Sequence, residues 1–485
     1  MSSRDALYIG GQWCAPLADG RIDVHEASTG EVLATVPSGG PADVDAAVGA
    51  AVDAFPAWSS TSVKERADVL RQVADALEAR EDELAEVMAR EVGTPIASSR
   101  RVQVGLGVGV FRSMAGVLEE APLEQRIGNS LVLRVAAGVV GAITPWNYPL
   151  YQLAAKVAPA MAAGCTTVVK PSSVAPLAAY VVADVVHELG VPPGVFSVVT
   201  GRGAEAGEVL VAHPGVDLVS LTGSTSAGAR VAELAARSIK RVTLELGGKS
   251  AFVICPDADL DAAVEAAVRT AYVNNGQTCS ATTRLIVTRD RLAEVEGRLA
   301  AHVGALVVGD PLDPATTLGP VASAGQYRSI QGFLDDAADQ GTVLVGGPGQ
   351  APGQDRGWFV RPTVVSRVAN TARLAREEIF GPVLVVVPVD DVDEAVQVAN
   401  DSDYGLSGAV WAGDVEQAVA VARRLRTGQV SVNGGRFNVL APFGGFKRSG
   451  VGRELGEHGL AEYVELVSLQ LPGDVPSTVS VPTAP

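Results

Sequence analysis

The chain has 485 residues, a formal charge of −17 from 38 basic and 55 acidic side chains, and a hydrophobic content of 47%. A chain of this length and apolar content folds into two or three domains and not into one core. An acidic surface repels phosphate backbones and anionic lipids, so nucleic acid and membranes are not expected partners.

The cysteines and the N-terminal residues indicate the compartment. Four cysteines show no CxxC pair and no Cys/His cluster with zinc-ligand spacing, so no metal site is expected. The N-terminal segment MSSRDALYIGGQW has no basic region followed by an apolar run, which predicts the absence of a signal peptide. We therefore expect a soluble cytoplasmic protein.

The predicted elements change character along the chain. Segments 42–55 and 64–93 repeat apolar residues at helical spacing, with charged residues on the other face, and predict amphipathic helices. From residue 131, short β-branched runs alternate with Ala-rich helical segments such as 177–190. The strands expected there are LVLRV, TTVVK, VFSVV and DLVSLT. Such alternation predicts a parallel, doubly wound sheet.

A second alternating set begins at residue 250. Its expected strands are SAFVI, TRLIVT, GTVLVGG, GPVLVVVPV, SGAVW and GQVSVN. The two sets together predict two α/β domains. The last segment, GDVPSTVSVPTAP at 473–485, is rich in Pro, Ser and Thr and predicts a loose end.

One glycine turn is a candidate phosphate-binding site. In SLTGSTSAGARVAELAA a strand-like run enters Thr222, Gly223 and Ser224, and a helical pattern starts near Gly228. Glycines let a backbone approach a ligand closely, and a helix N-terminus offers unpaired N–H groups to an anion. The spacing is GxxxxG and not the usual dinucleotide GxGxxG, so this turn alone is equally consistent with a simple strand-to-helix connection.

Six motifs surround this turn. They are TPWNYP at 144–149, KPSSVAP at 170–176, LELGGKS at 244–250, NNGQTC at 274–279, EEIFGPVL at 377–384 and PFGGFKRSGVGRE at 442–454. In order and approximate spacing, from about Ile9 to about Leu471, the set resembles the aldehyde dehydrogenase superfamily. The resemblance implies a dinucleotide-binding domain at 1–116 and 138–246 and a catalytic domain at 247–463. It also implies an oligomerisation arm with a C-terminal tail at 117–137 and 464–485, and hence a homodimer or a dimer of dimers.

The resemblance also implies oxidation of an aldehyde to an acid by three residues. Cys279 matches the nucleophile, because a carbonyl carbon releases hydride only after a nucleophile has made it tetrahedral. Asn147 matches the amide that stabilises the resulting oxyanion, and Glu245 matches the base that activates water against the thioester. Taken singly, these residues would be a small core residue, a turn-forming Asn and a solvated strand-end charge.

Ten further residues match cofactor contacts. Glu378 matches the ribose-binding carboxylate and Phe380 a ring that packs nearby; the others are Trp146, Lys170, Ser172, Ser173, Gly203, Gly223, Ser224 and Leu246. Many NAD-preferring relatives have Glu at the position of Ser173. A serine does not repel a 2′-phosphate, so we predict use of NAD or NADP, with NADP at least competitive.

The presence of Glu245 favours hydrolysis, because branches that transfer the acyl group to coenzyme A typically lack a carboxylate there. A CoA-acylating semialdehyde dehydrogenase and a catalytically silent nucleotide-binding member remain the alternatives. A kinase-like phosphate binder is excluded because no GxxxxGK[ST] follows a strand.

Four positions bear on the substrate and on proton transfer. Ala155 stands where many relatives have Trp, which predicts a wider tunnel and disfavours a betaine aldehyde. Arg436 is either a carboxylate-binding residue or a solvated arginine, and Phe437 is a candidate for an apolar wall. Glu454 is either a proton relay or the ion-pair partner of a neighbouring arginine. The sequence does not name the aldehyde.

Overall fold

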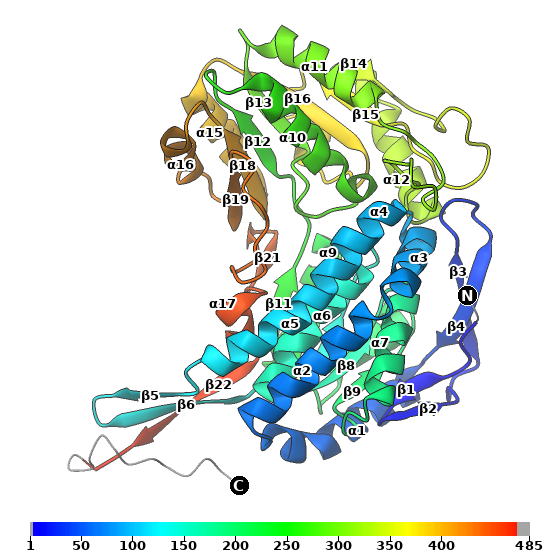
Figure 1. The fold of residues 1–485 in the computed structure, drawn as a ribbon, viewed down its shortest axis with the longest axis vertical. Helices are drawn as coiled ribbons and strands as arrows, with labels where there is room; N and C mark the ends of the chain where they lie inside the picture. Colours follow the sequence, from blue (N-terminus) through cyan, green and yellow to red (C-terminus); the bar gives the residue numbers. More distant parts are fainter. Residues whose placement is uncertain (1–2, 473–485) are drawn as a thin grey trace.

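Two parallel sheets, each covered by helices on both faces, organise the chain in the computed structural model, which describes residues 3–472 (Figure 1). The predicted α/β class is therefore confirmed. The predicted loose end at 473–485 lies outside the described residues. Helices form where the sequence supplies periodicity and end signals: Ser62 and Glu65 form a capping box at the start of α2 (Val63–Glu78), and Gly93 ends α3 (Glu81–Val92) in a left-handed conformation.

The larger sheet has a core of five parallel strands, with antiparallel strands at its edges. Its spatial order is β2 (Gln12–Cys14), β1 (Leu7–Ile9), β9 (Phe196–Val198), β8 (Thr166–Lys170), β7 (Val139–Ile143), β10 (Leu218–Thr222), β11 (Arg241–Glu245) and β21 (Gly450–Val451). The order reverses between β7 and β10, and ligands of such sheets bind beyond the carboxyl ends of the strands at that point.

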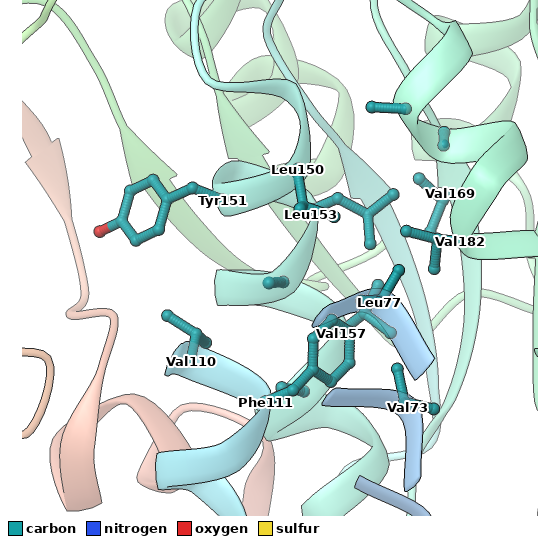
Figure 2. Close-up of a cluster of buried hydrophobic side chains, with 14 of the residues drawn as sticks. Val73, Leu77, Val110, Phe111, Leu150, Tyr151, Leu153, Val157, Val169 and Val182 are labelled. Atoms are coloured by element: carbon teal, nitrogen blue, oxygen red, sulfur yellow. The ribbon is translucent and has the colours of Figure 1, made fainter. Parts of the chain in front are cut away.

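Helices cover both faces of this sheet because successive strand residues point to opposite sides. Val169 belongs to one buried cluster and Val168 to another. Figure 2 shows part of the first cluster, in which Val157, Leu153 and Phe111 pack together. The helices of the first face are α2 (Val63–Glu78), α3 (Glu81–Val92), α5 (Gly105–Glu120), α6 (Pro149–Ala163) and α7 (Leu177–Glu188), and those of the second are α1 (Pro41–Ser59), α8 (Glu208–Ala212) and α9 (Thr225–Ala236).

The second sheet repeats this plan. Its order is β14 (Thr342–Val345), β15 (Thr363–Ser366), β16 (Val383–Val389), β13 (Arg284–Thr288), β12 (Ala251–Ile254), β18 (Ser407–Trp411) and β19 (Gln429–Val432), all parallel except β14. One face packs on α10 (Leu260–Tyr272) and α11 (Leu292–Gly304), and the other on α15 (Val392–Asn400) and α16 (Val415–Ala422). Short helices α12 (Ala324–Leu334), α13 (Ala337–Gln340) and α14 (Arg373–Arg376) lie near β14 and β16.

A three-stranded antiparallel sheet projects from the rest of the molecule as an arm (Figure 1). It pairs β22 (Val464–Gln470) with β6 (Ser130–Ala136), and β6 with β5 (Glu124–Ile127). Several of its apolar side chains are exposed, including Ile127 and Leu466. The smaller elements are the hairpin β3 (Gly20–His25) and β4 (Val32–Ser38), the pair β17 (Tyr404–Gly405) and β20 (Phe446–Lys447), α4 (Ile96–Ser98), α17 (Gly456–Ala461), and the short helices η1 (Ser99–Val104), η2 (Gly203–Gly207) and η3 (Val273–Gly276).

The expected strands all form, but LVLRV forms β6 of the antiparallel arm and not a strand of the parallel sheet, and the prediction missed other strands. It did not include β7 and β11 in the larger sheet, β15 in the second, or the N-terminal strands β1 to β4. Helix α9 begins at Thr225, earlier than the expected start near Gly228, because the Ser224 side chain accepts a hydrogen bond from the N–H of Ala227 and so caps the helix.

Candidate active site

The candidate residues lie where two sheet edges face each other. The carboxyl ends of β7, β8, β10 and β11 lead into Asn147, Lys170, Gly223 and Glu245. From the second sheet, the segment around Cys279 enters β13 at its N-terminal end, and Glu378 precedes β16 in the same way. The two edges meet at Gly248, where an added Cβ would lie 2.5 Å from the carbonyl oxygen of Cys279.

Cys279 is half-buried and lines a cavity of about 170 Å³. The other lining residues are Leu106, Tyr148, Tyr151, Gln152, Val273, Thr278, Ser280, Phe437 and Phe443. The cavity wall is therefore mainly apolar and aromatic. Burial raises the pKa of the Cys279 thiol, and the nearby carboxylates of Glu378, Glu245 and Glu454 raise it further.

The backbone before Cys279 is held in an uncommon conformation. Asn274, Asn275 and Gly276 have consecutive positive φ angles of 53°, 60° and 74°. Asparagine and glycine adopt this left-handed region more readily than other residues. The side chain of Asn275 fixes the turn, because its Nδ2 donates to the carbonyls of Gly93 and Pro320, each at 2.8 Å.

Asn147 is tied to the same loop. Its Nδ2 donates to the carbonyl of Gln277 at 3.0 Å, two residues before the cysteine. The backbone carbonyl of Asn147 accepts hydrogen bonds from Gln103 Nε2 at 2.8 Å and from Asn274 Nδ2 at 2.9 Å. Asn147 is 3% exposed, so its amide is held close to the nucleophile loop by contacts on two sides. The residues of NNGQTC therefore position Asn147 as well as Cys279.

Three carboxylates, those of Glu245, Glu378 and Glu454, lie near the thiol. Glu245 ends β11, is 3% exposed, and has no protein hydrogen-bond partner on either oxygen. Burial raises the pKa of Glu245 well above its ordinary range, and the Glu454 carboxylate adds to that rise. A carboxyl group with a raised pKa is suited to accept a proton near neutral pH.

Glu454 forms its ion pair with a lysine. Lys156 Nζ lies 2.5 Å from Glu454 Oε1 and also donates to Thr222 Oγ1 at 2.7 Å. Of the two alternatives for Glu454, the ion pair with a neighbouring arginine is wrong, because Arg453 donates to the carbonyls of Gly445 and Gly452. Both members of the observed pair are almost fully buried, so Glu454 joins helix α6 to the catalytic side of the molecule.

The candidate phosphate-binding turn has the geometry that a dinucleotide needs. Ser224 caps α9, a helix long enough to present a positive N-terminus, and no protein atom crowds Gly203. Gly228 lets α9 approach Leu246, since an added Cβ would lie 2.4 Å from that side chain. Lys170 ends β8 and donates to the Pro171 carbonyl at 2.8 Å; burial lowers the pKa of its ammonium group to about 8.

Ser172 and Ser173 lie in the same β8–α7 loop and are half-buried. The Ser172 hydroxyl accepts from the N–H of Val174 at 3.2 Å. Arg202, directly before η2 in the chain, is exposed.

Three residues form a second group of candidate cofactor contacts. Trp146 and Phe380 pack edge to face with ring centroids 5.3 Å apart. Glu378 Oε1 accepts from the N–H of Gly248 at 2.9 Å, and burial raises the pKa of this carboxyl to about 7. An added Cβ on Gly247 would lie 2.3 Å from Glu378 Oε2, so the glycine pair allows the carboxylate to lie on the backbone. These residues, with the helix terminus and Lys170, fit a dinucleotide.

The cavity wall shows where the residues that bear on the substrate lie. Ala155 is fully buried and is not among the residues that line the cavity. Tyr151, one helical turn earlier on the same face of α6, lines it instead. Phe437 lines the wall as considered, whereas Arg436 is exposed and does not. Sequence reasoning did not identify Tyr151 or Gln152, which stand two and three residues after NYP.

Within residues 3–472, His, Cys, Asp and Glu side chains form no group of three or more that could hold a metal ion. No helix in that part of the chain combines the length and the apolar character needed to cross a membrane.

Residues 13–469 match the Aldehyde dehydrogenase family, and the chain belongs to it. It is an NAD(P)-dependent oxidoreductase that oxidises aldehydes. A 3-succinoylsemialdehyde-pyridine dehydrogenase of Pseudomonas sp is 47% identical over 95% of this chain and 97% of its own length. Geranial dehydrogenase of Castellaniella defragrans is 46% identical, covering 96% and 98%.

Solved structures agree with the fold as well as the sequence. A mutant of aldehyde dehydrogenase C from Pseudomonas syringae, in complex with NAD+ and octanal, superposes with a TM-score of 0.96 at 46% identity, covering 98% of each chain. An aldehyde dehydrogenase from Mycobacterium tuberculosis, complexed with NAD+, also gives 0.96, at 39% identity and with 98% and 99% covered. The recognised family is thus confirmed.

Proposed function

We propose that Cys279, Asn147 and Glu245 carry out the oxidation, and that the product is released by hydrolysis. The single observation that supports this best is the grouping of three side chains: the half-buried Cys279 thiol in the cavity wall, the Asn147 amide bonded to the loop two residues before it, and the buried Glu245 carboxylate, whose charge acts on the thiol. The Cys279 sulfur attacks the aldehyde carbon and forms a thiohemiacetal. The Asn147 amide and the backbone N–H of Cys279 stabilise the oxyanion.

The residues proposed to hold the dinucleotide are Trp146, Lys170, Ser172, Ser173, Gly203, Gly223, Ser224, Leu246, Glu378 and Phe380. When bound, the oxidised nicotinamide supplies the hydride acceptor that makes the thioester possible. The protein's part is to orient the reacting carbon and to exclude bulk water. Ser173 carries no charge beside the ribose, so NADP is proposed to be at least competitive with NAD.

Glu245 is proposed to take the proton of the water that attacks the thioester. Its raised pKa suits this role, and its two unpartnered oxygens are available to water. This carboxylate is the observation that favours hydrolysis over transfer to coenzyme A, and its proximity to Cys279 argues against a catalytically silent protein.

The substrate is proposed to be an apolar aldehyde of medium chain length. The cavity is lined mainly by aromatic and aliphatic side chains. The names of two relatives refer to geranial and to 3-succinoylsemialdehyde-pyridine, and a solved relative contains octanal. The test is kcat/KM across linear aldehydes: values that rise from short to medium chains support the proposal, and a preference for carboxylate-bearing semialdehydes contradicts it.

The domain boundaries given above, the cytoplasmic location and the oligomeric state are also proposed. The exposed apolar residues of the arm, Ile127 and Leu466 among them, support pairing with a second subunit. We propose a homodimer or a dimer of dimers. A monomer in light scattering at micromolar concentration would contradict that assembly.

The direct test of the mechanism is Cys279→Ala. We expect aldehyde oxidation to be abolished while the cofactor still binds and the thermal midpoint stays near that of the wild type, because the thiol does not hold the dinucleotide. The measurements are turnover, cofactor binding by fluorescence and thermal denaturation. Turnover above a small fraction of wild type would exclude Cys279 as the nucleophile.

A further inference from the structure

Five buried polar atoms near the cavity have no protein hydrogen-bond partner. They are the Tyr151 hydroxyl, Gln152 Oε1, both carboxylate oxygens of Glu245, and Oε2 of Glu454. An unpaired buried polar atom costs about 1–3 kcal/mol, so folded proteins usually satisfy such atoms with another group or with ordered water. Five such atoms in one neighbourhood indicate a place where a small polar molecule belongs.

Their proximity follows from contacts along three segments. Helix α6 carries Tyr151 and, five residues later, Lys156, which binds Glu454. Glu454 and Phe443 exchange backbone hydrogen bonds of 2.8 and 2.7 Å. Phe443 lines the cavity together with Tyr151 and Cys279.

Glu245 reaches the same place through Gly444, the residue after Phe443. An added Cβ on Gly444 would lie 2.6 Å from Glu245 Oε1. Figure 2 shows the Tyr151 ring directed away from the hydrophobic cluster formed by its helix neighbours Leu150 and Leu153. The hydroxyl therefore points out of the core, and the cavity is where the ring lies.

The electrostatics agree with this arrangement. Burial raises the pKa of Tyr151 well above its ordinary value, and the charges that add to the rise are those of Glu454, Cys279 and Glu245, with a further contribution from Tyr148. Glu245 is influenced in turn by Glu454, and with opposite sign by Lys156.

We propose that Tyr151 positions the water that hydrolyses the thioester. Its hydroxyl accepts a hydrogen bond from the water, whose other proton is directed at Glu245. This inference rests on the proposed roles of Cys279 and Glu245. With both of its protons held by acceptors, the water presents a lone pair to the thioester carbon.

The chemical step is an ordinary hydrolysis. The water oxygen bonds to the carbonyl carbon as its proton passes to Glu245, and collapse of the tetrahedral intermediate breaks the C–S bond. Cys279 leaves as a thiolate, and the product is the carboxylic acid. Tyr151 transfers no proton; it fixes the water in place.

A hydroxyl is not needed for a cavity wall. Phe437 and Phe443 line the same cavity with plain rings. Tyr148 also lines it, but its hydroxyl already bonds Thr278 Oγ1 at 2.8 Å. Of the two cavity tyrosines, Tyr151 is therefore the one with a hydroxyl left for water.

The test is Tyr151→Phe, followed by stopped-flow measurement of the reduced cofactor. We expect a retained burst, because acylation does not use this water, and a later linear phase at least about fivefold slower, roughly 1 kcal/mol in the deacylation barrier. The KM for aldehyde should stay within about threefold of wild type. Added 2-mercaptoethanol attacks the thioester without the positioned water, so it should restore much of the linear rate.

The matched control is Tyr180→Phe, which removes a buried hydroxyl bonded to Thr200 Oγ1 at 3.1 Å on helix α7. It should keep the wild-type linear rate. A Tyr151→Phe linear phase within about twofold of wild type would overturn the inference, as would a loss explained by a raised KM and not relieved by the thiol. Either result leaves the proposed function standing if Cys279→Ala is inactive; an active Cys279→Ala would refute the proposed function itself.

Discussion

Replacement of Glu245 by Gln separates the two halves of the reaction. The carboxylate is 3% exposed and neither oxygen bonds a protein group, so an amide of the same shape breaks no contact. A positioned general base contributes about 10²–10⁴-fold to a rate, which corresponds to roughly 2.7–5.5 kcal/mol in the barrier. We expect deacylation to slow by this factor while acylation continues.

The same substitution should not destabilise the fold. Burial raises the pKa of Glu245, so the ionised carboxylate is disfavoured in the folded state once the pH exceeds its unfolded value. A neutral amide removes this penalty. The free energy of unfolding near neutral pH should therefore stay equal or rise, which denaturant titration can measure.

The assay is rapid mixing with aldehyde and excess cofactor. Glu245→Gln should release about one reduced cofactor per active site in a burst and then turn over slowly, whereas Glu81→Gln, on the exposed first turn of α3, should follow the wild type. An unchanged linear phase without a burst would exclude Glu245 as the deacylation base. Loss of the burst as well would show that Glu245 also activates the thiol.

Two further predictions concern the cofactor side of the site. Ser173→Glu should move the ratio of kcat/KM toward NAD by at least about tenfold, roughly 1.4 kcal/mol; a wild type that rejects NADP by more than about a hundredfold, roughly 2.7 kcal/mol, would show that another residue sets the choice. The second prediction concerns Glu378, whose pKa is raised from 4.5 to about 7 in the folded protein. Its contribution to the free energy of unfolding is therefore complete below pH 4.5 and is lost as the pH rises to about 7. The change is about 3 kcal/mol. Cofactor-free Glu378→Gln should show a correspondingly smaller fall in unfolding free energy across that window, and an identical pH dependence in both proteins would contradict the assignment.

Most of the parallel strands were predictable because their residues are β-branched and buried on both faces. The run TTVVK predicted β8 with its observed bounds, and the alternation of side chains along the strand places Val168 and Val169 on opposite faces. Strand β15 was missed because it has four residues between Pro362 and a turn, too short for a periodic signal. Strand β1 was missed because its place depends on pairing Tyr8 with Val198, a contact that no local pattern encodes.

Some residues of the candidate site were likewise predictable from the sequence, and others were not. Cys279 and Glu245 could be located because each stands in a motif whose local spacing is distinctive. The ion-pair partner of Glu454 could not be predicted, because Lys156 is 298 residues away in sequence and an arginine stands next to Glu454. Tyr151 was missed for a related reason: its proposed role depends on which side of α6 faces the cavity, and that is decided by the packing of α6 against α5 and α2.

The left-handed run at Asn274, Asn275 and Gly276 has a consequence for binding energetics. Backbone of this kind costs on the order of 1 kcal/mol or more for a residue that is not glycine, and the three hydrogen bonds of the Asn275 side chain, to Gly93, Pro320 and Gly319, hold it in place. The chain thus gives up the conformational entropy of the nucleophile loop when it folds. An arriving aldehyde meets a sulfur whose direction is already set, and no ordering of that loop is subtracted from its affinity.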